Sequence, residues 1–315
     1  MVILSSCPSG DYGEVVMSRE IGRLLTAMVT PFHQDGSVDY VQARNLAQAL
    51  INSGSDGVVV AGTTGESPTL TRKEQTRLFV EIKEALQGDA SVIAGTGSNS
   101  TQEAVEYTKD AEAAGADGAL LVVPYYNKPT QQGLYEHFRH IAESTSLPCI
   151  LYNVPSRTVT SLSAETTIKL SEIPNIVGVK EASADFEQIA TIIGGARPGF
   201  RVWSGNDADT FHLLCLGGYG VISVASHLVG RQIKSMIQML VDGSIDGAAK
   251  EHIRLLPLFK GIFVVANPIP IRYGVNQAGF SVGSPRLPLT EADPLTANFL
   301  DELFEQYQID LVPGM

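Results

Sequence analysis

The sequence has few cysteines, and they are not arranged for bonding to one another or to a metal. Cys7, Cys149 and Cys215 are odd in number and far apart, and no Cys-x-x-Cys pair occurs. The sequence therefore predicts neither a disulfide framework nor a zinc site. It also lacks any run of about 18 or more apolar residues, so no segment qualifies as a membrane-spanning helix. These absences favour a cytoplasmic protein.

Positive charge is scarce as well. The chain has 22 Lys and Arg against 34 Asp and Glu, which gives a formal net charge of −12. Nucleic acids and anionic membranes are bound by basic surfaces, so we expect neither as a partner. An anionic small substrate would need a local positive pocket.

Several signatures of common catalytic sites are also missing. The sequence has no Walker loop, nucleophile elbow or HExxH motif, and "GTGSNS" at 95–100 lacks the third glycine of a dinucleotide fingerprint. His137 and His140 lie three residues apart beside Glu136, a spacing that could bind a metal. Because no other ligands accompany them, we place both on the polar face of a helix and predict no metal site.

What the sequence does contain is a series of eight short apolar runs bounded by Gly, Pro or polar turn residues. Several are apolar at consecutive positions, as expected of parallel strands covered on both faces. The runs are residues 24–29, 56–62, 91–95, 118–123, 148–152, 176–180, 201–204 and 220–224.

Helical patterns with the i, i+3, i+4, i+7 spacing lie between these runs. They include Ala43, Leu46, Ala47 and Leu50; Leu78, Ile82, Ala85 and Leu86; and Leu134, Phe138, Ile141 and Ala142. Thr71-x-x-Glu74 is a capping box at the start of the second helix. Alternation of strand and helix fits a doubly wound sheet or a closed (β/α)₈ barrel. Eight units within about 220 residues favour the barrel.

The same patterns predict the division of the chain. We expect a loosely attached tail over residues 1–19, with Met17 as an alternative start, because no periodic pattern occurs there. The barrel would then occupy residues 20–243, and a small helical domain would occupy residues 244–315. The predicted fold is thus α/β, a (β/α)₈ TIM barrel with a C-terminal helical extension.

Lys180 is the central candidate for catalysis because it ends the sixth apolar run. In a barrel, catalytic groups gather where strands end. Burial there disfavours the ammonium form and frees the lone pair, and a free amine attacks a ketone to give a Schiff base. The alternative is a lysine that points outward or pairs with Glu181.

Other strand ends supply hydroxyl groups and a guanidinium. Thr63 and Thr64 lie in a glycine-flanked turn, where hydroxyl and N–H groups can bind a carboxylate; a capping box with Glu66 is the alternative. Tyr126 and Tyr152 could transfer protons or could be ordinary packed aromatics. Arg157 could bind a second carboxylate or form a surface salt bridge.

Four linked motifs resemble those of a known enzyme family. They are "DGVVVAGTTGES", "VPYYNKPTQQGLYEHF", "YNVPSRT" and "GVKEAS", and in order and spacing they are similar to the motifs of the dihydrodipicolinate synthase family of pyruvate-dependent class I aldolases. The resemblance implies a TIM barrel, a homotetramer built from two tight dimers, and no cofactor. It also implies a lyase that joins pyruvate to L-aspartate 4-semialdehyde in lysine and diaminopimelate synthesis.

The resemblance also implies roles for individual residues. Lys180 corresponds to the Schiff-base lysine, and Thr63, Tyr126 and Tyr152 to a proton relay, in which the residue matching Tyr126 crosses a dimer interface. Thr64 corresponds to a residue that holds the pyruvate carboxylate, and Arg157 to one that holds the carboxylate of the aldehyde. The positions that match Gly205 and Ile222 shape the pocket through their backbone.

Inhibition by lysine is a further implication. Ser67, Asn99, Glu103 and Tyr125 resemble the inhibitor pocket of the family, but Arg72 and Gln75 stand where lysine-sensitive members often have histidine. A cationic Arg72 near a cationic effector would lower affinity unless it points away, so we expect weak or altered inhibition.

Two other functions compete with the synthase. An N-acetylneuraminate lyase or 2-keto-3-deoxy sugar-acid aldolase would use the same lysine, but Arg157 after "YNVPS" and the paired threonines favour the synthase. A catalytically silent binding barrel is disfavoured because the lysine, both tyrosines and the relay threonine are all present. Metal-dependent aldol chemistry lacks a ligand cluster in the sequence.

Overall fold

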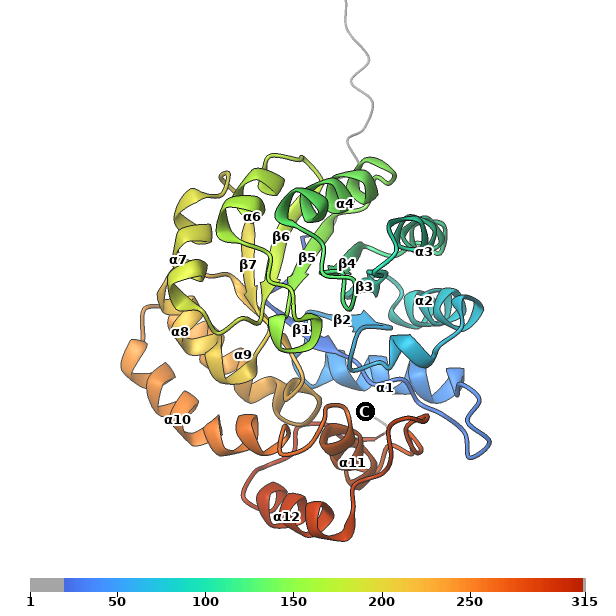
Figure 1. Cartoon of the computed structure of the whole chain (residues 1–315). Helices are drawn as coiled ribbons and strands as arrows, with labels where there is room; N and C mark the ends of the chain where they lie inside the picture. Colours follow the sequence, from blue (N-terminus) through green and yellow to red (C-terminus); the bar gives the residue numbers. More distant parts are fainter. Residues whose placement is uncertain (1–19, 314–315) are drawn as a thin grey trace, which may run out of the picture.

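The computed structural model describes residues 20–313, and its centre is a closed barrel of eight parallel strands (Figure 1). Each strand pairs with its sequence neighbour, and β1 pairs with β8 to close the barrel. The predicted barrel is therefore confirmed, whereas the tail predicted over residues 1–19 lies outside the described residues. The strands are β1 (Leu24–Ala27), β2 (Gly57–Val60), β3 (Ser91–Gly95), β4 (Gly118–Val122), β5 (Cys149–Asn153), β6 (Ile176–Glu181), β7 (Arg201–Ser204) and β8 (Gly220–Ser223).

Helices surround the barrel (Figure 1). They are α1 (Tyr40–Asn52), α2 (Arg72–Leu86), α3 (Thr101–Ala113), α4 (Gln131–Glu143), α5 (Pro155–Thr158), α6 (Ala164–Ser171), α7 (Phe186–Gly195), α8 (Thr210–Cys215) and α9 (Ser226–Val241), with short 3₁₀ helices η1 (Ser67–Thr69) and η2 (Asp207–Asp209). The capping box at α2 forms as predicted, since the side chains of Thr71 and Glu74 each bond the other's backbone N–H.

Apolar side chains form two layers, one inside the barrel and one between the strands and the helices. Alternate residues of each strand face the two layers. The inner layer includes Leu25, Val59, Ile93, Leu120, Ile150, Trp203 and Ile222. This filling leaves the polar ends of the strands at one mouth of the barrel as the place for chemistry.

One prediction about α4 is wrong. His137 does not lie on a polar face of this helix; it is buried, and its Nδ1 lies 2.9 Å from Thr101 Oγ1. The packing of α4 against α3 covers this position, and burial lowers the pKa of His137 to about 4. His140 is exposed as expected.

A C-terminal helical region follows the barrel. It consists of α10 (Ile245–Gly261), α11 (Ile269–Gln277) and α12 (Pro294–Phe304), and Figure 1 shows all three on one side of the molecule, in orange and red. Both α10 and α11 contact α9, and α12 packs on both of them. Among residues 20–313 no helix has the length and apolar character needed to span a membrane.

Candidate active site

A cavity of about 140 Å³ opens where the strands of the barrel end. It brings together residues that are far apart in the sequence, including Lys180, both threonines of the β2 loop, Tyr152, Arg157 and Gly205. Its full lining is Ala27, Val59, Gly62, Thr63, Thr64, Leu120, Tyr152, Val154, Ser156, Arg157, Lys180, Gly205, Asn206, Val224, Phe263 and Asn267. Most of the residues expected at the strand ends therefore line one cavity.

Lys180 is part of the lining of this cavity, and only 5% of its surface is exposed. Burial lowers the pKa of its amine to about 8, with a smaller contribution in the same direction from Arg157, while Asp207 opposes the shift. The outward-pointing alternative is therefore contradicted. A larger fraction of the neutral amine exists near neutral pH than for an exposed lysine, which is what a nucleophilic amine requires.

Glu181 does not pair with Lys180. It follows Lys180 on β6, so its side chain points to the opposite face of the strand. Its carboxylate accepts hydrogen bonds from Asn153 Nδ2, Gln188 Nε2 and the backbone N–H of Ser183. The Glu181 carboxylate therefore has its hydrogen-bond partners on the other face of the strand and does not form an ion pair with the Lys180 amine.

Asp207 is a residue near the site to which the sequence analysis assigned no role. It is buried and interacts electrostatically with Lys180. Ser223 Oγ and the backbone N–H groups of Val224 and Ala225 donate to its carboxylate. Burial raises the pKa of Asp207, and these hydrogen bonds oppose the rise. Asp207 follows the seventh apolar run, but no local pattern links it to the amine.

Tyr152 lies beside the amine, with Lys180 Nζ 4.3 Å from the centre of its ring. β5 and β6 are in register at these two residues. Burial raises the pKa of the Tyr152 phenol, while Arg157 and a hydrogen bond with the Thr63 side chain oppose the rise. A protonated phenol that is hydrogen-bonded to a hydroxyl, and whose ring lies against the amine, is able to transfer protons near the reacting atoms.

Thr64 and Arg157 are both connected to the C-terminal region through Asn267. Asn267 Nδ2 donates to Thr64 Oγ1 at 2.9 Å, and the Asn267 carbonyl oxygen accepts from Arg157 Nη2 at 3.5 Å. The capping alternative for the β2 loop is contradicted, because the Glu66 side chain bonds Arg272 instead of the Thr63 backbone. Asn267 and Phe263 were missed because no motif in the sequence marks them.

Gly205 needs its lack of a side chain. A Cβ at this position would lie 2.6 Å from Ala182 Cβ and 3.2 Å from Lys180 Cε. Any larger residue would therefore press on the lysine. Ile222 does not line the cavity; it is buried in the inner layer of the barrel, opposite Leu25 of β1.

Tyr126 lies away from this cavity. It is 89% exposed, and its φ of 75° places it in the left-handed region, in the loop between β4 and α4. Within one chain, then, the tyrosine is not brought to Lys180.

The residues expected to bind an inhibitor are partly gathered. Asn99 Nδ2 donates to the Tyr125 carbonyl at 3.2 Å, and Glu103 accepts from Ser98 Oγ at 2.8 Å. The Ser67 carbonyl accepts from Gln75 Nε2. Arg72 points toward α3, where it pairs with Asp110 and Glu106.

Metal binding finds no support among residues 20–313, where no three His, Cys, Asp or Glu side chains form a group able to hold an ion. The chemistry that the cavity offers is instead that of an amine, a phenol and hydroxyl groups next to a guanidinium. Such a set can capture a keto acid covalently and hold carboxylates.

Comparisons with known proteins identify the family. The model of the dihydrodipicolinate synthetase family matches residues 20–306. A 4-hydroxy-tetrahydrodipicolinate synthase of Dehalococcoides mccartyi (strain ATCC BAA-2266 / KCTC 15142 / 195) is 62% identical over 293 residues, which cover 93% of this chain and 99% of the relative.

Solved structures show the same fold. A dihydrodipicolinate synthase from Cyanidioschyzon merolae with lysine bound has a TM-score of 0.89 and 49% identity, and the match covers 91% of this chain and 98% of the other. A monomeric dihydrodipicolinate synthase variant has a TM-score of 0.88 and 41% identity, with 90% and 96% of the two chains covered.

Proposed function

Since this chain belongs to the dihydrodipicolinate synthetase family, we propose that it joins pyruvate to L-aspartate 4-semialdehyde as a lyase of lysine and diaminopimelate synthesis. The observation that carries the proposal is the burial of Lys180 in the cavity beside Tyr152, Thr63 and Thr64. The amine forms the covalent intermediate itself, so the reaction needs no cofactor. This activity also fits a cytoplasmic location.

The first half of the reaction makes an enamine. The neutral Lys180 amine attacks the keto carbon of pyruvate, and water leaves as the imine forms. The imine then loses a proton from the pyruvate methyl group to give the enamine. The Tyr152 phenol, hydrogen-bonded to Thr63, donates and accepts protons in these steps.

The second half builds the ring. The enamine carbon attacks the aldehyde carbon, which forms the new carbon–carbon bond and an alcohol after protonation. The amino group of the semialdehyde then attacks the imine carbon, and the bond to Lys180 breaks, which returns the free amine. The product is a hydroxylated tetrahydropyridine dicarboxylate. We assign one carboxylate to Thr64 and the other to Arg157, and we propose that Gly205, which lines the cavity, shapes this pocket through its backbone.

Two measurements test the proposal. Borohydride reduction in the presence of pyruvate should leave a stable adduct on the peptide that contains Lys180, detected by mass spectrometry. A coupled assay with a downstream reductase should then show turnover with the semialdehyde. Turnover of N-acetylneuraminate or of 2-keto-3-deoxy sugar acids instead would favour a sugar-acid aldolase, and absence of any adduct would favour a silent barrel.

Arg157→Ala is expected to raise the KM for aspartate semialdehyde and to leave the KM for pyruvate nearly unchanged. Losing a charge-assisted hydrogen bond costs about 1.5–3 kcal/mol, or roughly 10- to 100-fold in KM. Steady-state kinetics with each substrate varied in turn will measure the two KM values separately. An exposed guanidinium away from the cavity, Arg139, provides the control substitution. Unchanged semialdehyde kinetics in Arg157→Ala would contradict the assignment.

We further propose that the chain assembles as a homotetramer made of two dimers, in which Tyr126 completes the site of the adjacent subunit. The exposure of Tyr126 in the single chain supports this, because a relay residue has no function in solvent. A solved relative is a monomeric variant, so the assembly must be measured directly, by sedimentation of the chain and of Tyr126→Ala.

We also propose that the barrel ends near residue 243, before α10 begins at Ile245.

Lysine is expected to inhibit weakly through a pocket that includes Ser67, Asn99, Glu103 and Tyr125. A relative binds lysine, but Arg72 here is engaged by Asp110 and Glu106, and Gln75 by backbone carbonyls. Because the charge of Arg72 is already paired, we attribute the weaker inhibition to missing contacts rather than to repulsion.

A lysine dose–response curve measures this inhibition. The double variant Arg72→His/Gln75→His should shift the curve to lower lysine concentration, and Lys109→Gln, an exposed change on α3, should leave it in place. Tight inhibition of the unmodified chain would refute the expectation.

A further inference from the structure

The loop that carries Thr63 and Thr64 ends in a buried carboxylate. Glu66 directly follows this loop, is 2% exposed, and has a φ of 58°, in the left-handed region. Its Oε1 accepts from Arg272 Nη2 at 2.5 Å, and its Oε2 accepts from the backbone N–H of Arg286 at 3.0 Å. Both partners come from the C-terminal region, more than two hundred residues away in the sequence.

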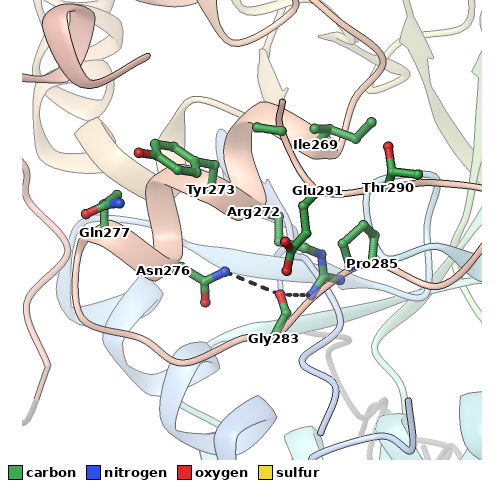
Figure 2. A pocket seen from close by; sticks show the side chains of 10 residues that line it. Ile269, Arg272, Tyr273, Asn276, Gln277, Gly283, Pro285, Thr290 and Glu291 are labelled. Atoms are coloured by element: carbon green, nitrogen blue, oxygen red, sulfur yellow. Dashed lines mark hydrogen bonds between the residues drawn. The ribbon is translucent and has the colours of Figure 1, made fainter. Parts of the chain in front are cut away.

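Arg272 connects the loop to two other segments. It is 2% exposed. Its Nη2 also donates to the Thr30 carbonyl at 2.7 Å, and its Nη1 donates to the Val282 carbonyl at 2.6 Å and to that of Gly283 at 3.3 Å. Figure 2 shows the bond from Arg272 to Gly283, whose carbonyl also accepts from Asn276. One guanidinium therefore fixes the β1 loop, the β2 loop and the 282–283 segment together.

The same loop is also held from its other side. Thr30 Oγ1 donates to the Gly65 carbonyl at 2.6 Å, and Asn267 donates to Thr64 at 2.9 Å. A Cβ on Gly65 would lie 3.0 Å from the Met28 carbonyl oxygen, so the loop has little room to move toward β1. Arg272 thus acts on a short, constrained segment whose hydroxyl groups face the cavity.

A buried ion pair is an inefficient way to stabilise a fold, since desolvation offsets most of its attraction. Its better-supported use is to specify one arrangement among several. Here the carboxylate belongs to the segment that lines the keto-acid end of the cavity, and the guanidinium belongs to α11. What the pair specifies is the position of the loop relative to Lys180.

We propose that Arg272, through Glu66, is a positioning residue that holds Thr63 and Thr64 in the geometry that binds the carboxylate of a 2-keto acid. The inference rests on the proposed function and extends it. It assigns to α11, outside the barrel, a role in binding the first substrate. Neither Arg272 nor Glu66 lines the cavity, so both act through the loop.

Arg272→Lys and Glu66→Gln are the test variants. Lysine keeps the charge but replaces the planar guanidinium fork, whose two terminal nitrogens reach separate partners, with one compact ammonium group. Glutamine keeps the shape of Glu66 but weakens the charge-assisted bond. Each is expected to raise the KM for pyruvate by about 10- to 100-fold, the cost of a displacement of about 1 Å. The KM for the semialdehyde should change much less. The double variant should resemble the worse single variant, because the two residues act as one unit.

Leu303→Ala is the matched control. Leu303 is buried in α12 and packs on α10, so its truncation lowers the melting temperature without touching the β2 loop. If Arg272→Lys fails to fold, Glu66→Gln alone decides the question. A pyruvate KM that is unchanged in the folded variants, or that rises equally in Leu303→Ala, overturns the inference.

Borohydride trapping separates this inference from the proposed function. If the unmodified chain forms no adduct with pyruvate, the proposed function fails. If the unmodified chain is trapped and the variants are trapped at the same pyruvate concentrations, only the role of Arg272 fails. If the variants are trapped only at pyruvate concentrations about 10- to 100-fold higher, the result supports the proposal.

Discussion

Lys180→Ala is expected to reduce turnover by roughly 10⁴- to 10⁶-fold and to abolish the borohydride-trapped adduct with pyruvate. In the proposed mechanism the amine forms the covalent bond, and burial lowers its pKa to about 8, which makes it available as a nucleophile. Within residues 20–313, no other lysine lines the cavity. Coupled-assay kinetics and mass spectrometry of the reduced protein will measure both effects.

Lys180→Arg is the control for charge. It keeps a cation near Asp207 but offers no nucleophile, because arginine stays protonated. Its turnover should be as low as that of Lys180→Ala, while its melting temperature stays closer to that of the unmodified chain. An adduct that persists in either variant would place the Schiff base on another residue.

Tyr152→Phe is expected to lower kcat by about 10²- to 10⁴-fold, the usual contribution of a positioned acid–base group. The ring that packs against Lys180 remains, so the cavity keeps its shape and the fold stays intact. The adduct with pyruvate should still be trapped at long times, but it should form more slowly. Single-turnover trapping at several times will distinguish slower formation of the adduct from weaker binding of pyruvate.

Tyr219→Phe is the matched control. The Tyr219 hydroxyl donates to the Ile21 carbonyl at 3.1 Å, next to the start of β1 and far from the strand ends that form the cavity. Its loss should leave kcat unchanged. If both phenylalanine variants lose the same activity, or if neither does, the relay role of Tyr152 is wrong.

Many residues of the candidate site could be predicted because each follows an apolar run of strand length in the sequence. Apolar runs of strand length followed by polar residues mark the strand ends, and Lys180, Thr63, Tyr152 and Arg157 stand at or just after those ends. The register of β5 and β6 then placed Tyr152 opposite Lys180. Local sequence sufficed here because parallel strands of a closed barrel present their carboxyl ends at one mouth.

Other parts could not be predicted in this way. The burial of His137 depends on how α4 packs against α3, and the electrostatic interaction of Asp207 with Lys180 depends on the pairing of β6 with β7. Asn267 and Arg272 contact the β2 loop across about two hundred residues of sequence. Neither has a motif that would reveal its partner.

The sequence by itself determined the type and order of the elements, the barrel, and the candidate lysine at the end of β6, because hydrophobic periodicity and strand-end residues are local properties. Tertiary structure alone decided which carboxylate influences the pKa of that lysine, which C-terminal residues hold the threonine loop, and that Tyr126 lies outside the cavity of its own chain. These features are contacts between distant segments, and their energies depend on burial and geometry that no short stretch of sequence specifies.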